Sequence, residues 1–273
     1  MKNKAFSIPF YLWLGFFVIL PLGLIVYYGF TSADGGFSVD NFARFADEMY
    51  LKVFWRSIKI AVISTIACIF IGYPAAYILA RGNLKYKNLI LLLVMLPMWM
   101  NFLLRTYSWL SLLENSGLIN SFLGKFGIDP IQFLYNENAV IFGTVYNFLS
   151  FMIMPIHTVL IKLDESLMEA AADLGATPVK RFFKIVLPFS VPGVLSGIAM
   201  VFVPSVTTFV ISQLMGGGKV PLVGDVIEKQ FRVVNDWHFG SAVSLVVMVC
   251  VLLFMYAINK GDESDTDRQG MII

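Results

Sequence analysis

Residues 60–80 read IAVISTIACIFIGYPAAYILA, twenty-one positions without a single Asp, Glu, Lys or Arg. Hydrocarbon excludes charged side chains, and a helix needs about 20 consecutive apolar residues to cross a bilayer. A stretch of this length and composition therefore predicts a membrane-spanning helix.

Five more charge-free stretches lie on either side of it, over 5–33, 88–104, 138–161, 185–218 and 237–259. Each is long enough for one span, since the usual range is about 17–25 residues. No segment alternates apolar and polar residues with a period of two, which argues against a membrane β-barrel. We expect an all-α polytopic membrane protein with six transmembrane helices, at about 8–30, 57–80, 88–110, 139–162, 191–213 and 241–259.

The composition of the whole chain supports this class. Of 273 residues, 58% are hydrophobic and 14% charged, and the mean hydropathy is +0.76. Soluble domains are about 45–50% apolar and about 25% charged. These values exclude a disordered chain, a nucleic-acid-binding protein and a disulfide-stapled secreted domain. Cys68 and Cys250 lie in apolar runs and are expected to be reduced packing residues.

Basic residues predict the orientation. If the N-terminus is cytoplasmic, the inner segments hold eleven Lys and Arg and the outer loops hold seven, which agrees with the positive-inside rule. The first apolar run, 5–33, is longer than the signal-peptide core of about 7–15 residues, so we expect it to stay as the first span. The chain should be a multi-pass protein of the inner (plasma) membrane with both termini in the cytoplasm.

The segment between the fourth and fifth spans, residues 163–188 (the 163–188 loop), has the features of two short helices. Asp164 suits a helix N-terminus, and Gly175 suits the position just after a helix end. Thr177 and Pro178 then form a second start signal. The residues alone also fit an amphipathic helix resting on anionic lipid headgroups, because the second half is basic.

The spacing of seven residues in this loop resembles the EAA loop of ABC-importer permeases. The resemblance implies a type I ABC-importer permease, a single transmembrane domain over 1–273, whose loop forms a coupling helix in a groove of a cytoplasmic ATPase. The docking core would be Glu169, Ala170, Ala171 and Gly175, while Ile185, Leu187 and Pro188 would close the second helix and lead into the fifth span.

Further blocks resemble the B-type permeases of spermidine/putrescine importers, notably 72–74, 97–107, 214–217 and 236–240. This implies polyamine transport together with three kinds of partner: a homologous C-type permease, two copies of an ABC ATPase and an external polyamine-binding protein. ATP and Mg²⁺ would bind to the ATPase, so this chain would need no cofactor and would not be an enzyme. The alternative is the same architecture with another cargo, such as a different cationic amine, an amino acid or an inorganic ion.

A polyamine is a flexible polycation, which carboxylates and aromatic faces stabilise. Packing, interfacial aromatic belts and solvated loop charges are the competing explanations for such residues. The candidates for the substrate path are Trp99, Asn101 and Tyr107 in the third span, Pro204, Thr208 and Gln213 in the fifth, and Asp225 and Asp236 in the loop that follows. We expect Pro204 to interrupt the fifth span, because a proline frees a backbone carbonyl.

Other function classes lack their motifs. Residues 216–219 read GGGK, but position 213 is Gln and position 220 is Val, so the stretch is not a phosphate-binding loop. No Asp or Glu is central to any span, as an ion-coupled carrier would commonly require. His157 and His238 have no ligand-spaced partners, so we expect no metal site. Lys59 and Arg105 fall within predicted spans near the outer interface.

Overall fold

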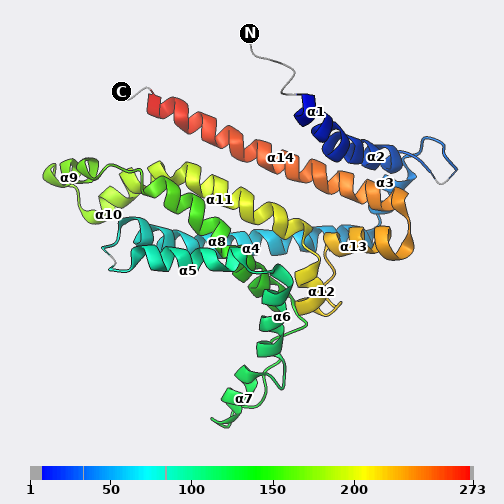
Figure 1. Ribbon diagram of the computed structural model, residues 1–273, viewed down its shortest axis with the longest axis horizontal. Coiled ribbons are helices and arrows are strands. Elements are labelled where there is room, and N and C mark those ends of the chain that lie inside the picture. The colour runs from blue at the N-terminus through cyan, green and yellow to red at the C-terminus, as the bar shows by residue number, and fades with distance from the viewer. Residues whose placement is uncertain (1–7, 33, 84, 271–273) are drawn as a thin grey trace.

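The computed structural model describes residues 8–32, 34–83 and 85–270, and helices make up most of this part of the chain (Figure 1). The termini, which the sequence predicts to be cytoplasmic, lie outside the described residues at 1–7 and 271–273. The bundle has two ends. The one that carries α9 is called the loop end, and the opposite one the far end.

Three helices form the centre of the bundle: α4 (Glu48–Arg81), α8 (Glu137–Leu160) and α11 (Leu187–Thr207). They pack closely because small residues lie where they cross. A Cβ on Gly197 of α11 would lie 2.7 Å from the sulfur of Met152 on α8, and one on Gly72 of α4 would lie 3.0 Å from Met152 Cγ. Apolar surface gives little drive for association within lipid, so close backbone approach of this kind supplies the packing energy.

The first predicted span is one apolar rod made of α1 (Ile8–Leu14), a π-helical segment (Gly15–Ile19) and α2 (Leu20–Gly29). It lies against α14 (Trp237–Gly270), the sixth predicted span (Figure 1). None of its most apolar 18-residue window is buried within this chain, whereas the other long helices bury 28–50% of theirs. A short helix, α3 (Asp40–Phe45), joins it to α4.

The third predicted span is not a single helix. It divides into α5 (Lys87–Trp99) and α6 (Phe102–Leu113), and the chain bends by 98° between them. The helix stops because Met100 has an extended backbone (ψ 147°) and the Asn101 side chain caps the helix that follows. With α7 (Leu118–Gly124), α6 forms an arm directed away from the bundle (Figure 1).

The fifth predicted span also differs from expectation. Pro204 does not interrupt it, since α11 continues to Thr207 and Thr208 is the first extended residue (ψ 139°). A proline removes one backbone donor but leaves the φ angle of a helix unchanged, so a packed helix can pass through it. Two short helices follow, α12 (Val210–Gly216) and α13 (Val223–Lys229), with a π-helical segment (Gln230–Val234) leading to α14.

Five helical segments within the described residues are long and apolar enough to cross a membrane, and the bent pair makes a sixth if it is counted as one span. The five are Pro9–Gly29, Glu48–Arg81, Glu137–Leu160, Pro178–Thr207 and Trp237–Ile258. The all-α polytopic fold predicted from the sequence is confirmed.

Replacing Gly193 of α11 with Leu should destabilise the bundle. A Cβ there would lie 2.9 Å from the Pro155 carbonyl oxygen and 3.0 Å from Ile156 Cα, both on α8. Overpacking of this kind costs about 1–3 kcal/mol, so the thermal midpoint in detergent should fall. Gly23→Leu is the matched control because no atom lies within 4 Å of its added Cβ. Equal midpoints for the two variants would contradict the packing account.

Candidate functional site

The 163–188 loop begins with a capped helix, α9 (Glu165–Asp173). The Asp164 carboxylate accepts a hydrogen bond of 2.9 Å from the Ser166 backbone N–H. This bond lowers the pKa of Asp164 below its ordinary value. The carboxylate satisfies one of the free donors at the helix start, as the sequence predicts.

The end of α9 is a Schellman motif. The Ala176 N–H donates to the Ala171 carbonyl at 2.9 Å, and the Gly175 N–H donates to the Ala172 carbonyl at 2.8 Å. Closing this pair of bonds requires a left-handed residue, and Gly175 supplies it with φ +79°. The glycine therefore fixes both the length of α9 and the direction in which the chain leaves it.

The second helix of the loop starts as predicted but does not end at Pro188. Thr177 Oγ1 accepts from the Lys180 N–H at 3.3 Å and caps α10 (Pro178–Arg181). A π-helical segment (Phe182–Val186) then leads directly into α11, making one helical run over Pro178–Thr207. Here Ile185 and Leu187 continue the fifth span rather than close a separate helix. The wider turn accommodates Pro188, which has no N–H for a regular helical bond.

The 163–188 loop presents an apolar surface to its surroundings. Glu169 and Ala170 are exposed on α9, and Ala171 is half-buried. Four large apolar side chains are strongly exposed around them: Leu167 at 50%, Leu174 at 89%, Val179 at 66% and Phe183 at 59%. Leu167 and Leu174 lie on and just after α9, whose ends are fixed by caps, and Val179 and Phe183 lie on the helical run that follows. Exposed apolar side chains of this size are typical of an interaction surface.

Three of the predicted path residues lie on the helices that flank the α5–α6 bend or within it. Trp99 ends α5 and is 77% exposed, and Tyr107 on α6 is 49% exposed. The Asn101 side chain caps α6, since its oxygen accepts hydrogen bonds from the N–H groups of Leu103 (2.9 Å) and Leu104 (3.2 Å). The geometry gives Asn101 a structural task, while the two aromatic rings remain free to contact another molecule.

Arg105 holds the same bend from inside. Its side chain is only 6% exposed and donates to the Pro97 carbonyl, one of the groups left without a regular helical donor where α5 ends. The guanidinium carbon also lies 5.8 Å from the centre of the Tyr146 ring on α8. The side chain is therefore buried within the protein.

At the far end, α12 and α13 enclose a hollow of about 360 Å³, here called the 212–233 hollow. Ser212 donates to the Asp225 carboxylate at 2.6 Å, and Gln213 donates to the Glu228 carboxylate at 3.4 Å. Asp225 and Glu228 are one turn apart on α13 and so face the same way. The full lining is Ser212, Gln213, Gly218, Val220, Pro221, Asp225, Glu228, Lys229 and Val233.

Burial raises the pKa of Asp225 above the ordinary value for a carboxyl. The bonds from Ser212 and from the Leu222 N–H (2.7 Å) act in the opposite direction, and nearby Glu228 raises the pKa further. Gln213 and Asp225 are among the path candidates predicted from the sequence, but Glu228 is not. The i, i+3 spacing of the two acids on a short helix is the signal that could have joined them.

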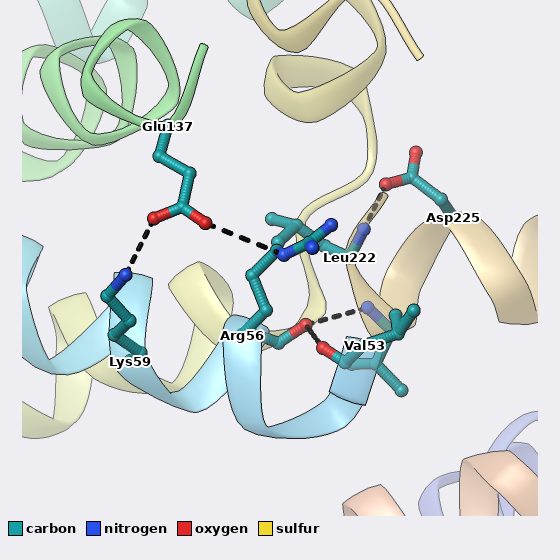
Figure 2. A network of polar contacts seen from close by, with 8 residues as sticks. Val53, Arg56, Lys59, Glu137, Leu222 and Asp225 are labelled. Atoms are coloured by element: carbon teal, nitrogen blue, oxygen red, sulfur yellow. Dashed lines mark hydrogen bonds and ion pairs between the residues drawn. The ribbon is translucent and has the colours of Figure 1, made fainter. Parts of the chain in front are cut away.

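One polar link fastens this region to α4, and a second joins α4 to α8 nearby (Figure 2). Ser57 of α4 accepts from the Val223 N–H at 2.7 Å, which ties the start of α13 to the buried face of α4. Glu137, at the start of α8, reaches Lys59 at 2.7 Å and Arg56 at 3.6 Å on α4. Lys59 is thus neutralised by an acid at the far end of the bundle.

The remaining path candidates are not part of the hollow. Asp236 pairs with Arg44 at 2.7 Å and accepts from the Phe239 N–H at 3.0 Å, so it joins α3 to the start of α14. Burial raises its pKa, but these bonds outweigh burial and leave the pKa below its ordinary value. Pro204 lies within α11, and Thr208 lies in the break after it. Among the described residues, no group of three His, Cys, Asp or Glu side chains could hold a metal ion.

Comparison with known proteins places this geometry in a family. The family of binding-protein-dependent transport system inner membrane components matches residues 69–260, which include the whole 163–188 loop. The chain belongs to this family. It is therefore a permease, a channel-forming component of an ABC transporter located in the membrane.

Several curated relatives match most of this permease. The spermidine/putrescine transport system permease protein PotB of Haemophilus influenzae is 41% identical over 254 residues, covering 89% of each chain. PotB of Escherichia coli strain K12 is 39% identical and covers 89% of this chain and 92% of its own. The inner membrane ABC transporter permease protein YdcU of the same strain is 26% identical, covering 91% and 86%.

Solved structures agree on the fold. A bacterial alginate ABC transporter, in complex with its alginate pentasaccharide-bound periplasmic protein, contains a chain that matches with a TM-score of 0.79 at 16% identity. The match covers 94% of this permease and 92% of that chain. The MetNI methionine transporter matches with a TM-score of 0.54 over 80% of this permease and 94% of its own chain. At these identities the likeness concerns the fold alone.

Proposed function

We propose that this permease imports polyamines of the spermidine/putrescine type and that a separate ATPase drives it. The observation that carries the proposal is the identity of about 40% with permeases named for spermidine and putrescine, over 89% of this chain. That identity includes a coupling-type loop whose helix α9 is capped at both ends and exposes an apolar face. A rigid helix with an open face suits the transfer of a rigid-body motion.

The proposed assembly has four kinds of component. Two copies of the ATPase would bind ATP and Mg²⁺, with the exposed patch of Leu167, Leu174, Val179 and Phe183 as the surface one of them covers. A second permease of the C type would complete the channel, and an external polyamine-binding protein would deliver the cargo. The loop end would then face the cytoplasm with both termini, and the far end would face outward.

The substrate path would start at the 212–233 hollow. Asp225 and Glu228 there offer carboxylates to a primary ammonium, and Gln213 offers an amide oxygen. Exposed Trp99 and Tyr107 at the α5–α6 bend offer aromatic faces to the same cation. Thr208 would lie beside this route, in the break between α11 and α12 where the regular helical bonding stops.

The direct test of the proposal is uptake in cells that lack this permease and carry it on a plasmid. Labelled spermidine and putrescine should enter only with the plasmid, while a labelled neutral amino acid should not depend on it. If the plasmid restores uptake of the amino acid or another solute and not of the polyamines, the proposed cargo is wrong. The assignment of the chain as a permease would still hold.

Gly175→Leu should weaken the docking of the ATPase. A side chain at φ +79° costs about 1–2 kcal/mol, so the end of α9 should rearrange and both ATPase co-purification and uptake should fall about tenfold. Gly127→Leu is the matched control, because it carries a similar strain (φ +74°) with no atom within 4 Å of its Cβ, outside the loop. Normal ATPase recovery with Gly175→Leu would contradict this role for α9.

Asp225→Asn should change the pH dependence of uptake. Only the ionised carboxylate attracts an ammonium, and its raised pKa means that this attraction is lost on acidification at a higher pH than for an ordinary Asp. The variant should lose this acid-side decline and show about a tenfold higher KM, the low end of the worth of a charged hydrogen bond. Glu48→Gln, an exposed acid paired with Lys52, is the control. An unchanged pH profile in Asp225→Asn would exclude it from the path.

A further inference from the structure

Three cationic side chains at the loop end donate to backbone carbonyls rather than to carboxylates. Lys87 of α5 reaches the Ala80 carbonyl of α4 at 2.8 Å, and Arg81 at the end of α4 reaches the Leu163 carbonyl at 2.9 Å. Arg181 of α10 reaches the Met168 carbonyl of α9 at 3.2 Å. Each bond joins two different helices or a helix to the 163–188 loop.

The Ala80 carbonyl is in the last turn of α4, and the Leu163 carbonyl is in the short connection between α8 and α9. The cation at Ala80 satisfies an orphan acceptor of the last helical turn and also interacts favourably with the negative end of the α4 dipole, while the cation at Leu163 satisfies a carbonyl outside either helix. The bonds are therefore stronger than a contact between two neutral groups, and their direction is set by the fixed carbonyl.

Leu163 is the point where the loop meets the bundle. Its side chain is only 4% exposed and belongs to the same core cluster as Leu79 and Ala80 of α4 and Leu160 of α8. Asp164, the next residue, caps α9. Residue 163 is therefore the point at which the start of α9 joins the bundle, and Arg81 fastens that residue to α4.

We propose that Arg81 is a positioning residue for energy coupling, which keeps α9 and the inner end of α4 moving as one body. This inference rests on the proposed function, because it assumes that an ATPase moves α9. The contact passes motion of α9 directly to α4, which packs against both α8 and α11 in the bundle centre. Lys87 extends the same connection to α5, and Arg181 closes it between α9 and the run into α11.

The geometry also explains why an arginine suits position 81. Its planar head is always charged and offers five N–H donors in a fixed arrangement, so one can hold the carbonyl while the others remain hydrated. Without it, the Leu163 carbonyl is left to water, and α9 can pivot about residues 161–164 while α4 stays in place. A lysine can reach the same acceptor but with a less fixed direction.

The test uses the full transporter complex in proteoliposomes, with Arg81→Gln, Arg81→Lys and the control Lys85→Gln. Lys85 is exposed in the segment between α4 and α5, and its ammonium lies 5.7 Å from the centre of the Tyr86 ring. Its replacement removes one positive charge without freeing a backbone carbonyl. Three quantities are measured for each: ATPase recovery with the complex, polyamine moved per ATP hydrolysed, and hydrogen exchange of the amides over 163–174.

We expect Arg81→Gln to recover the ATPase normally, to move about fivefold less polyamine per ATP and to exchange its α9 amides about fivefold faster. Arg81→Lys should restore part of both losses, and Lys85→Gln should match the wild type. An unchanged transport ratio and exchange rate in Arg81→Gln, or an equal loss in Lys85→Gln, would overturn the inference. If the wild-type complex moves no polyamine, the proposed cargo is wrong. The hydrogen-exchange rates of the α9 amides then test the role of Arg81 by themselves.

Discussion

The constraint behind most of this structure is that lipid cannot hydrogen-bond to a peptide group. Every backbone donor and acceptor within the bilayer must find its partner inside the chain. Regular helices meet this demand by themselves. Where the helices bend or contain a proline, at the α5–α6 bend and near Pro188, specific hydrogen bonds replace the regular ones. Arg105 serves the Pro97 carbonyl at the α5–α6 bend, and the Asn101 oxygen serves the first donors of α6. Just before Pro188 a π-helical segment shifts the backbone hydrogen bonding by one residue, so that the Leu187 N–H donates to the Phe182 carbonyl.

The same constraint shapes the packing. Since burying an apolar side chain gains little where the solvent is itself apolar, the central helices associate through close contact and a few polar links. Glycine at the α8–α11 crossing brings the backbones together, and a hydrogen bond of 2.9 Å joins Tyr73 to Ser190 across α4 and α11. A centre built this way resists internal deformation, because Gly193 and Gly197 lie directly against the α8 backbone. It therefore tends to move as a unit when one end is displaced.

How much the sequence predicts depends on the range of the interaction involved. Charge-free length predicts the spans, and the caps at Asp164, Gly175 and Thr177 are visible because each acts within about four residues. The bend at Met100 was not predicted, since it depends on Arg105 reaching back to Pro97 inside a folded bundle. The hollow joins Gln213 to Glu228 only after α12 and α13 have packed together. At Pro204 the sequence predicts a break that the structure does not have, because a proline inside a packed helix need not end it.

The shortness of α5 has a consequence for the energy barrier that a polycation meets. A helix of 13 residues extends about 20 Å, whereas the hydrocarbon core of a bilayer is about 30 Å thick. The chain then turns aside by 98°, so beside α5 about a third of that thickness is not matched by a straight helix. Water entering there would form a vestibule that lets an ion keep its hydration shell for part of the crossing. The electrostatic work of moving the polycation across the membrane grows with the thickness of the low-dielectric layer. That work would then be confined to the thinner hydrophobic layer that remains.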